Sequence, residues 1–137
     1  MKLDPSTFVA GSDLLQALGK HSNELSCNGG RVLFHQGESP QGLYILEQGK
    51  ATITMTSPQG KEIMSFEASS GSLLGLPGLI SDEPYTLTAV AHEGARLSFV
   101  PRDEFKHMMQ GDSHLALKIL QVLAAEVRSA RSALANR

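Results

Sequence analysis

The chain has no tryptophan and only one cysteine among its 137 residues, and aromatic side chains make up just 5% of it. A single thiol, Cys27, forms no disulfide within the chain and supplies too few ligands for a zinc or iron–sulfur site. We therefore interpret Cys27 as a structural thiol in a reducing compartment. The remaining composition is that of a globular protein, and the length suits one domain spanning residues 1–137.

An excess of charge of either sign is also absent. The formal net charge is −2, so no overall field draws the chain to nucleic acid or to an anionic membrane. The N-terminal residues contain no apolar run long enough for a signal peptide, and no later segment approaches the ~18 apolar residues of a membrane-spanning helix. We expect a cytoplasmic protein that neither enters a membrane nor binds DNA directly.

The sequence also lacks the usual histidine spacing of a metal-dependent jelly-roll enzyme. Cupin-type enzymes place an H-x-H pair on one strand, with a nearby glutamate, so that the ligands point inward together. No such pair occurs among His21, His35, His92, His107 and His114. We therefore predict no metal site, no catalytic residues and no enzyme activity, with a cupin-like metal-dependent enzyme as the alternative.

Between about Arg31 and Val100 the sequence contains short segments rich in β-branched and aromatic residues. Glycine and proline separate them at close intervals, which is typical of antiparallel hairpins rather than of alternating strands and helices. The predicted strands are Val32–His35, Leu43–Glu47, Ala51–Thr56, Glu62–Glu67, Tyr85–Ala91 and Arg96–Val100. The pattern predicts a mainly β fold with flanking helices, an antiparallel β-roll of the jelly-roll or double-stranded β-helix type.

A short helix is predicted before the first strand. Apolar residues from Leu14 to Leu18 have helical spacing, and Gly19 follows where a helix usually ends. Ser12 or Asp13 is the candidate N-cap, because both side chains accept hydrogen bonds from the first free N–H groups of a helix.

Two more helices are predicted after the last strand. The first spans Asp103–Gln110, and Asp112 or Ser113 caps a long one over about residues 113–135. Its apolar residues follow a heptad repeat and also occupy a second face, so two surfaces must cover it. One is its own β core, and the other suits a partner helix; the alternative is a single broad apolar face packed on its own domain. We predict a homodimer whose interface contains Leu120, Leu123, Val127, Ala130 and Leu134.

Four glycine-containing motifs occur along the predicted strands: VLFHQGE at 32–38, GLYILEQGKA at 42–51, GKEI at 60–63 and GSLLGL at 71–76. Their order and spacing resemble the cyclic-nucleotide-binding sensor domain of bacterial regulators of the catabolite-activator (Crp/Fnr) type. The resemblance covers most of the chain and implies an eight-stranded jelly roll with a long C-terminal dimerisation helix. Such regulators continue into a DNA-binding domain, which is therefore on another protein or in a part that this sequence leaves out.

The resemblance also implies where a ligand would bind. In this family a loop and a short helix, the phosphate-binding cassette, face the cyclic phosphate with backbone N–H groups. The matching segment is Gly75–Tyr85. The resemblance implies ligand-binding positions at Gly75, Leu76, Pro77, Gly78, Leu79, Tyr85 and Thr86.

Two cassette positions depart from the members that bind cyclic nucleotide. Those members carry a glutamate for the ribose hydroxyl and an arginine for the phosphate where this sequence has Leu76 and Tyr85. Losing a charged hydrogen bond costs ~1.5–3 kcal/mol, so two losses weaken binding by roughly 10²- to 10⁴-fold. Pro77 removes one backbone donor as well. We expect cAMP and cGMP to bind weakly or not at all, and the pocket to be lined by Leu73, Leu74, Leu76, Tyr85 and Leu87.

These observations predict a non-enzymatic ligand-sensing or regulatory module, such as the effector domain of a transcription regulator. The ligand is a small molecule that the sequence does not identify, and no bound cofactor is expected. A scaffold that keeps the fold and the dimer interface without binding any ligand is a further alternative.

Overall fold

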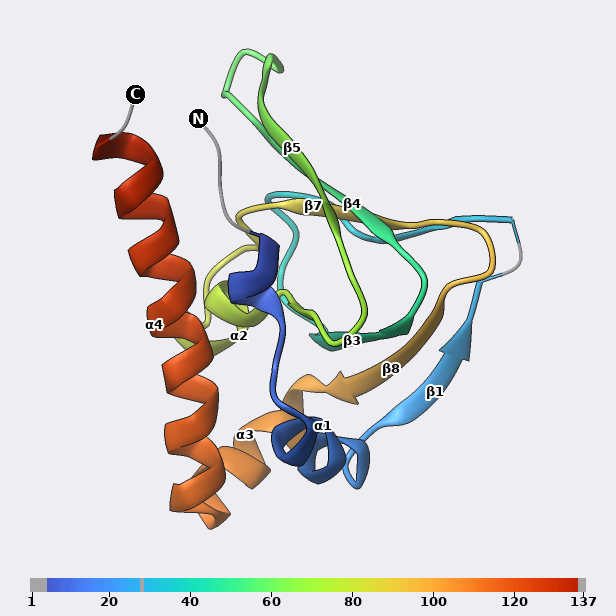
Figure 1. The fold of residues 1–137 in the computed structure, drawn as a ribbon, viewed down its shortest axis with the longest axis vertical. Helices are drawn as coiled ribbons and strands as arrows, with labels where there is room; N and C mark the ends of the chain where they lie inside the picture. The colour runs from blue at the N-terminus through green and yellow to red at the C-terminus, as the bar shows by residue number, and fades with distance from the viewer. Residues whose placement is uncertain (1–4, 28, 136–137) are drawn as a thin grey trace.

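The computed structural model describes residues 5–27 and 29–135, which form a β-roll with helices along one side (Figure 1). In this part of the chain, eight strands form two antiparallel sheets, in the orders β1-β8-β3-β6 and β2-β7-β4-β5. The strands are β1 (Asn23–Ser26), β2 (Arg31–Phe34), β3 (Gly42–Gln48), β4 (Ala51–Thr56), β5 (Glu62–Ala68), β6 (Leu73–Leu74), β7 (Thr88–Ala91) and β8 (Arg96–Pro101). The helices are the 3₁₀ turn η1 (Pro5–Phe8), α1 (Ser12–Gly19), α2 (Leu76–Ser81), α3 (Arg102–Gly111) and α4 (Ser113–Ala135).

The mainly β architecture with flanking helices is confirmed, and the six predicted strands are all present. Most of their ends agree within one residue, but β7 begins at Thr88 rather than at Tyr85. The sequence does not predict β1 or β6. Strand β1 has one apolar residue, Leu25, and β6 has only two residues, so neither shows a period of two.

Of the two predicted helix N-caps, that of α4 is confirmed and that of α1 is wrong. The N-cap of α1 is Gly11, whose carbonyl oxygen accepts from the Leu15 N–H (3.0 Å), so the predicted cap at Ser12 or Asp13 is wrong. Asp13 instead pairs with Lys118 on α4. The predicted cap of α4 is confirmed at Asp112, whose Oδ1 accepts from the Leu115 N–H (3.0 Å). No helix within the described ranges has the length and apolar character needed to span a bilayer.

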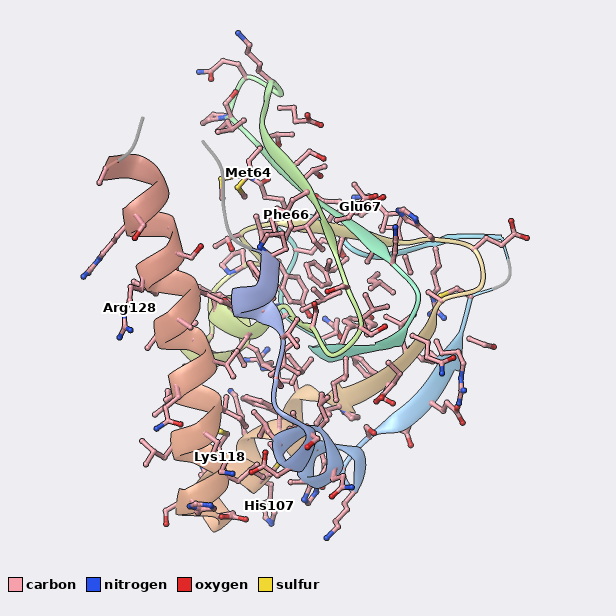
Figure 2. All side chains as sticks on the ribbon, in the orientation of Figure 1. Met64, Phe66, Glu67, His107, Lys118 and Arg128 are labelled. Atoms are coloured by element: carbon pink, nitrogen blue, oxygen red, sulfur yellow. The ribbon has the colours of Figure 1, made fainter. Side chains whose placement is uncertain are left out.

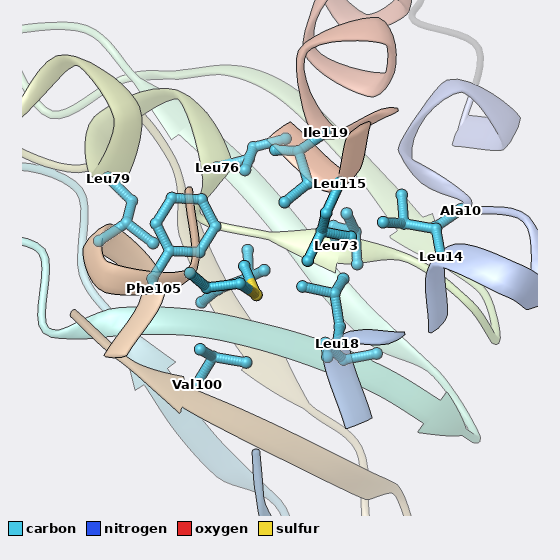
Figure 3. Packing of buried hydrophobic residues seen from close by; sticks show 13 residues of the cluster. Ala10, Leu14, Leu18, Leu73, Leu76, Leu79, Val100, Phe105, Leu115 and Ile119 are labelled. Atoms are coloured by element: carbon cyan, nitrogen blue, oxygen red, sulfur yellow. The ribbon is translucent and has the colours of Figure 1, made fainter. Parts of the chain in front are cut away.

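The core consists of two apolar clusters on opposite faces of the sheet that contains β3. Leu43 and Ile45 point toward the helices, whereas Leu46 points into the roll, because side chains alternate along a strand. Figure 3 shows the helical cluster, in which Phe105 of α3 and Ile119 of α4 lie close to the cassette. Burying each such side chain contributes ~1.5–3 kcal/mol, so the cassette is anchored to the helices through this cluster.

Candidate functional site

The segment predicted as the cassette forms a tight turn and one short helix. After β6, Gly75 turns the chain with φ of 94°, and α2 follows over Leu76–Ser81. An added Cβ on Gly75 would lie 2.8 Å from the Tyr85 ring, and one on Gly78 would lie 2.9 Å from the Glu83 carbonyl oxygen. Gly75 is therefore required both by its positive φ and by close approach, and Gly78 by close approach.

Tyr85 fastens the end of the cassette to the start of β3. Its hydroxyl donates to the Gly42 carbonyl oxygen (2.8 Å) and accepts from the N–H groups of Gln41 (3.0 Å) and Gly42 (3.3 Å). Its backbone N–H donates to the Glu38 carbonyl oxygen (2.9 Å), and its carbonyl oxygen accepts from the Gly37 N–H (2.8 Å). A hydroxyl has one donor and two acceptor positions. All three are used within the protein, so the phenol has none left for a ligand.

The ring of Tyr85 is buried and stacks on Phe34, with ring centroids 4.0 Å apart and an angle of 21° between the planes. Such a pair adds ~0.5–1.5 kcal/mol to the free energy of burial. Burial raises the pKa of the Tyr85 phenol above its usual value, so the side chain is neutral at physiological pH. It can neither replace the charge of an arginine nor move away without breaking this stack.

A small cavity, which we call the cradle, lies beside Tyr85. Its volume is about 20 Å³, which is room for about one water molecule. Pockets that hold small molecules usually measure ~300–1,000 Å³, so a nucleotide does not fit in this conformation. The cradle is lined by Phe8, Phe34, Ile53, Leu74, Gly75, Pro77, Gly78, Tyr85, Thr86 and Leu87.

The described residues that line the cradle carry no charge. Two basic side chains of α3 are already paired just beyond the end of α2, because Asp82 binds both Arg102 and Lys106 (3.3 Å). On the loop that Tyr85 contacts, the carboxylate of Glu38 accepts from the His35 N–H (2.7 Å). The lining of the cradle therefore offers an anion no positive partner.

Most of the predicted ligand-binding positions lie at the cradle, but two do not. Those that line it are Gly75, Pro77, Gly78, Tyr85 and Thr86. Leu76 and Leu79 are fully buried on the other side of α2, in the cluster with Phe105 (Figure 3). A ligand at the cradle would contact neither side chain.

The predicted apolar pocket is correct for Leu74, Tyr85 and Leu87 and wrong for Leu73 and Leu76. Leu73 and Leu74 are adjacent on β6, so their side chains point to opposite faces of the sheet. Leu76 shares the inner face of α2 with Leu79 and packs against the helices. Three further apolar residues line the cradle and were not predicted from the sequence: Phe8, Phe34 and Ile53. Phe34 and Ile53 lie on strands, and their inward-facing positions were the signal by which they could have been predicted.

Helix α4 buries one face and exposes another. Leu115 and Ile119 are buried against the domain, whereas Leu117, Leu120 and Val127 are exposed. The exposed side carries a shallow groove of about 380 Å³, and Figure 2 shows Arg128 on the side of α4 away from the roll. The groove is lined by Leu120, Leu123, Ala124, Val127, Arg128 and Arg131. An exposed apolar stripe of this kind is typical of a helix that packs against a partner.

Three of the predicted interface residues, Leu120, Leu123 and Val127, line this groove. Ala130 is half-buried and does not, and the side chain of Leu134 lies outside what the structure describes. Ala124 lines the groove and was not predicted.

Within the described ranges, no group of three or more His, Cys, Asp and Glu side chains is placed to hold a metal ion. Two of the histidines have other neighbours. The Nε2 atom of His92 lies 2.7 Å from Oγ1 of Thr52, and Nδ1 of His21 lies 2.6 Å from a carboxylate oxygen of Glu104.

Solved structures of bacterial regulators share this fold. The catabolite activator protein of Thermus thermophilus superimposes with a TM-score of 0.77 at 22% identity, over 96% of this chain and 62% of that chain. The sensor domain of the transcriptional regulator DNR of Pseudomonas aeruginosa gives a TM-score of 0.66 at 24% identity, over 89% and 82%. These likenesses show the fold.

Curated relatives match over a small part of their own length. Lysophospholipase NTE1 of Chaetomium globosum is 24% identical over 105 residues, which is 77% of this chain and 7% of that protein. Neuropathy target esterase sws of Drosophila persimilis is 32% identical over 76 residues, 56% of this chain and 5% of that protein.

The model of the cyclic nucleotide-binding domain matches residues 24–112. This range contains seven strands of the roll in full, the whole cassette and α3. The chain therefore belongs to the cyclic nucleotide-binding domain family.

Proposed function

We propose that the chain is a non-enzymatic regulatory domain of this family that does not bind cAMP or cGMP. The observation that supports the proposal is that Tyr85 is buried and fully hydrogen-bonded within the protein. Its hydroxyl is fully used by β3, and its ring helps to reduce the cradle to about 20 Å³. A cyclic phosphate would enter an uncharged, apolar space and lose its hydration without gaining an ionic partner.

Isothermal titration calorimetry of the pure protein with each nucleotide tests this proposal. We expect no saturable heat with cAMP or with cGMP. A dissociation constant in the low micromolar range for either nucleotide would show that backbone N–H groups suffice to bind it, and would overturn the proposal.

A double substitution distinguishes a cradle that is closed by packing from one that lacks only two functional side chains. The double variant Leu76→Glu with Tyr85→Arg restores the residue types of nucleotide-binding members. We expect it to remain without binding, because Leu76 is fully buried among apolar residues and an unpaired carboxylate there costs several kcal/mol. The cradle would prove to be open after all if this variant folded and bound cAMP in the micromolar range.

We further propose that the domain forms a homodimer through the exposed face of α4. The support is the apolar groove on that face, because a stripe of leucine and valine facing water is unfavourable unless a partner covers it. Leu120→Glu should convert the dimer into a monomer in light-scattering measurements. Val32→Glu is the matched control, since Val32 is 46% exposed and Leu120 is 43% exposed, but Val32 lies on β2. A monomeric unmodified protein at high micromolar concentration would contradict the proposal.

The regulatory partner is proposed on chemical grounds. A net charge of −2 disfavours direct DNA binding, so we propose that the domain acts on a DNA-binding or other effector part through its dimeric helix.

The cupin-like enzyme and the ligand-free scaffold are the alternatives. Stoichiometric iron, zinc or manganese in elemental analysis would favour the enzyme.

A further inference from the structure

The segment before α1 runs between the roll and α4 (Figure 1). We call residues 5–10 the strap. Its backbone makes few bonds to the roll: the Ala10 N–H donates to the Gly71 carbonyl oxygen (2.9 Å), and Val9 forms an isolated bridge with Ser72. Gly71 has φ of 92°, and an added Cβ would lie 3.0 Å from Val9. The strap is thus held close to the end of β5, but without a ladder of hydrogen bonds.

The side chain of Phe8 forms one wall of the cradle. Phe8 is 6% exposed and forms part of the cradle lining. Its ring packs on Phe66 of β5 with centroids 5.2 Å apart, and Figure 2 shows Phe66 beside η1. A ligand larger than a water molecule must therefore displace part of this lining, and Phe8 is the lining residue that comes from outside the roll and the cassette.

The same strap covers the inner face of α4. Element η1 packs on α4 as well as on β5, and Val9 shares a groove with Lys118 and Val122 of α4. Glu126 lies one helical turn beyond Val122 and therefore on the same face. One short segment thus contacts the cradle, a strand of the roll and α4.

The face of α4 on which the strap packs carries a destabilising feature. The carboxyl of Glu126 is 8% exposed, and its Oε1 atom has no hydrogen-bond partner among the described residues. A buried polar atom without a partner is destabilising, and this cost is recovered when water reaches the atom. Separation of the strap from α4 is therefore less costly than separation of two apolar surfaces.

We propose that the strap is a built-in closure of the cradle. Phe8 keeps the cradle shut, and release of the strap opens the cradle and uncovers the inner face of α4 in one step. A molecule that enters the cradle thereby changes how α4 packs against the roll. Helix α4 also carries the groove at Leu120 and Val127. This proposal does not depend on the identity of the ligand or on whether nucleotides bind.

Hydrogen–deuterium exchange of the full chain tests this proposal with two variants of opposite effect. Phe8→Ala should accelerate exchange in residues 5–10, 84–88 and 122–130 together by roughly tenfold or more, because deleting a buried phenylalanine removes several kcal/mol of packing. Glu126→Leu should slow exchange in residues 5–10 and 122–130, because it replaces the unpartnered carboxyl with an apolar group. Exchange in β1 and β8 should be unchanged in both variants.

Leu97→Ala is the matched control, because Leu97 is fully buried in β8, in the cluster inside the roll. It should accelerate exchange in its own sheet and leave residues 5–10 and 122–130 as they are. Phe8→Leu gives the same test with a smaller change should Phe8→Ala fail to fold. Uniform acceleration over the whole chain, faster exchange at 84–88 without a change at 122–130, or faster exchange in Glu126→Leu would each overturn the proposal.

Discussion

Replacing Glu126 with glutamine should stabilise the protein at neutral pH and not at acidic pH. The carboxyl is buried and has no partner for Oε1 among the described residues. Burial raises its pKa from 4.5 to about 8, because a carboxylate is poorly solvated in an apolar contact. The folded protein therefore keeps Glu126 protonated at pH 7, whereas the unfolded chain releases that proton.

The sign of the effect follows from proton linkage. Between pH 4.5 and 8 the folded state binds the extra proton, so the free energy of unfolding decreases as the pH rises. A shift from 4.5 to about 8 corresponds to a decrease of roughly 5 kcal/mol in full, and of about 3 kcal/mol by pH 7. Glutamine has nearly the same shape and does not titrate. Glu126→Gln should therefore equal the parent near pH 4.5 and exceed it by about 3 kcal/mol at pH 7.

Urea unfolding followed by circular dichroism at pH 5, 6 and 7 measures this difference. The protein concentration must be constant, because association contributes to apparent stability. Glu93→Gln is the control: Glu93 is exposed in the turn before β8, so its replacement should change stability by less than ~0.5 kcal/mol. The hydrogen bond to Lys118 lowers the pKa of Asp13. The stability that this bond contributes is lost only as the pH falls below about 4, so it does not change between pH 5 and 7. An equal pH dependence of the parent and Glu126→Gln would refute the reasoning.

Two further substitutions test the geometry of the cassette. Tyr85→Phe removes the hydroxyl that bonds Gln41 and Gly42, and should lower the free energy of unfolding by ~1–3 kcal/mol because those groups lose a buried partner; an unchanged urea midpoint would contradict this. Gly75→Ala places a Cβ 2.8 Å from the Tyr85 ring, whereas Gly60→Ala meets open space at a similar positive φ. The Gly75 variant should therefore be clearly the less stable in thermal unfolding, with Gly60→Ala losing only the ~1–2 kcal/mol of backbone strain.

The roll could be predicted from the sequence because its strands are rich in β-branched and aromatic residues and its turns contain glycine. Strand β4 has the predicted ends, and β3 differs by one residue at each end. The start of β7 could not be predicted in this way. Tyr85 is a good strand former, but its backbone bonds Gly37 and Glu38 of a distant loop instead of a neighbouring strand. The local β-propensity of the sequence does not predict where β7 begins, because tertiary contacts determine it.

The composition of the cradle was predicted less well than the cassette backbone, for a similar reason. The structure has a turn and a short helix in the segment that the resemblance indicated, but the resemblance could not say which side of α2 Leu76 faces, because a helix of six residues has no clear periodicity. Nor could it predict Phe8. The ring contact between Phe8 and Phe66 joins residues far apart in sequence, and a single aromatic residue near the N-terminus has no pattern that indicates its partner.

Two glycines of the cassette are required by packing, whether or not a ligand binds. Gly75 approaches the Tyr85 ring, and Gly78 approaches the carbonyl oxygens of Glu83 and Pro84, so both are required even when the cradle is closed. A family motif built on such glycines therefore recognises the backbone of the cassette and not its ligand. The resemblance implies that the side chain at position 85 decides which ligand can bind. An arginine there extends its charge toward a phosphate, whereas Tyr85 directs its hydroxyl to Gly42 and turns the same backbone into a packed part of the core.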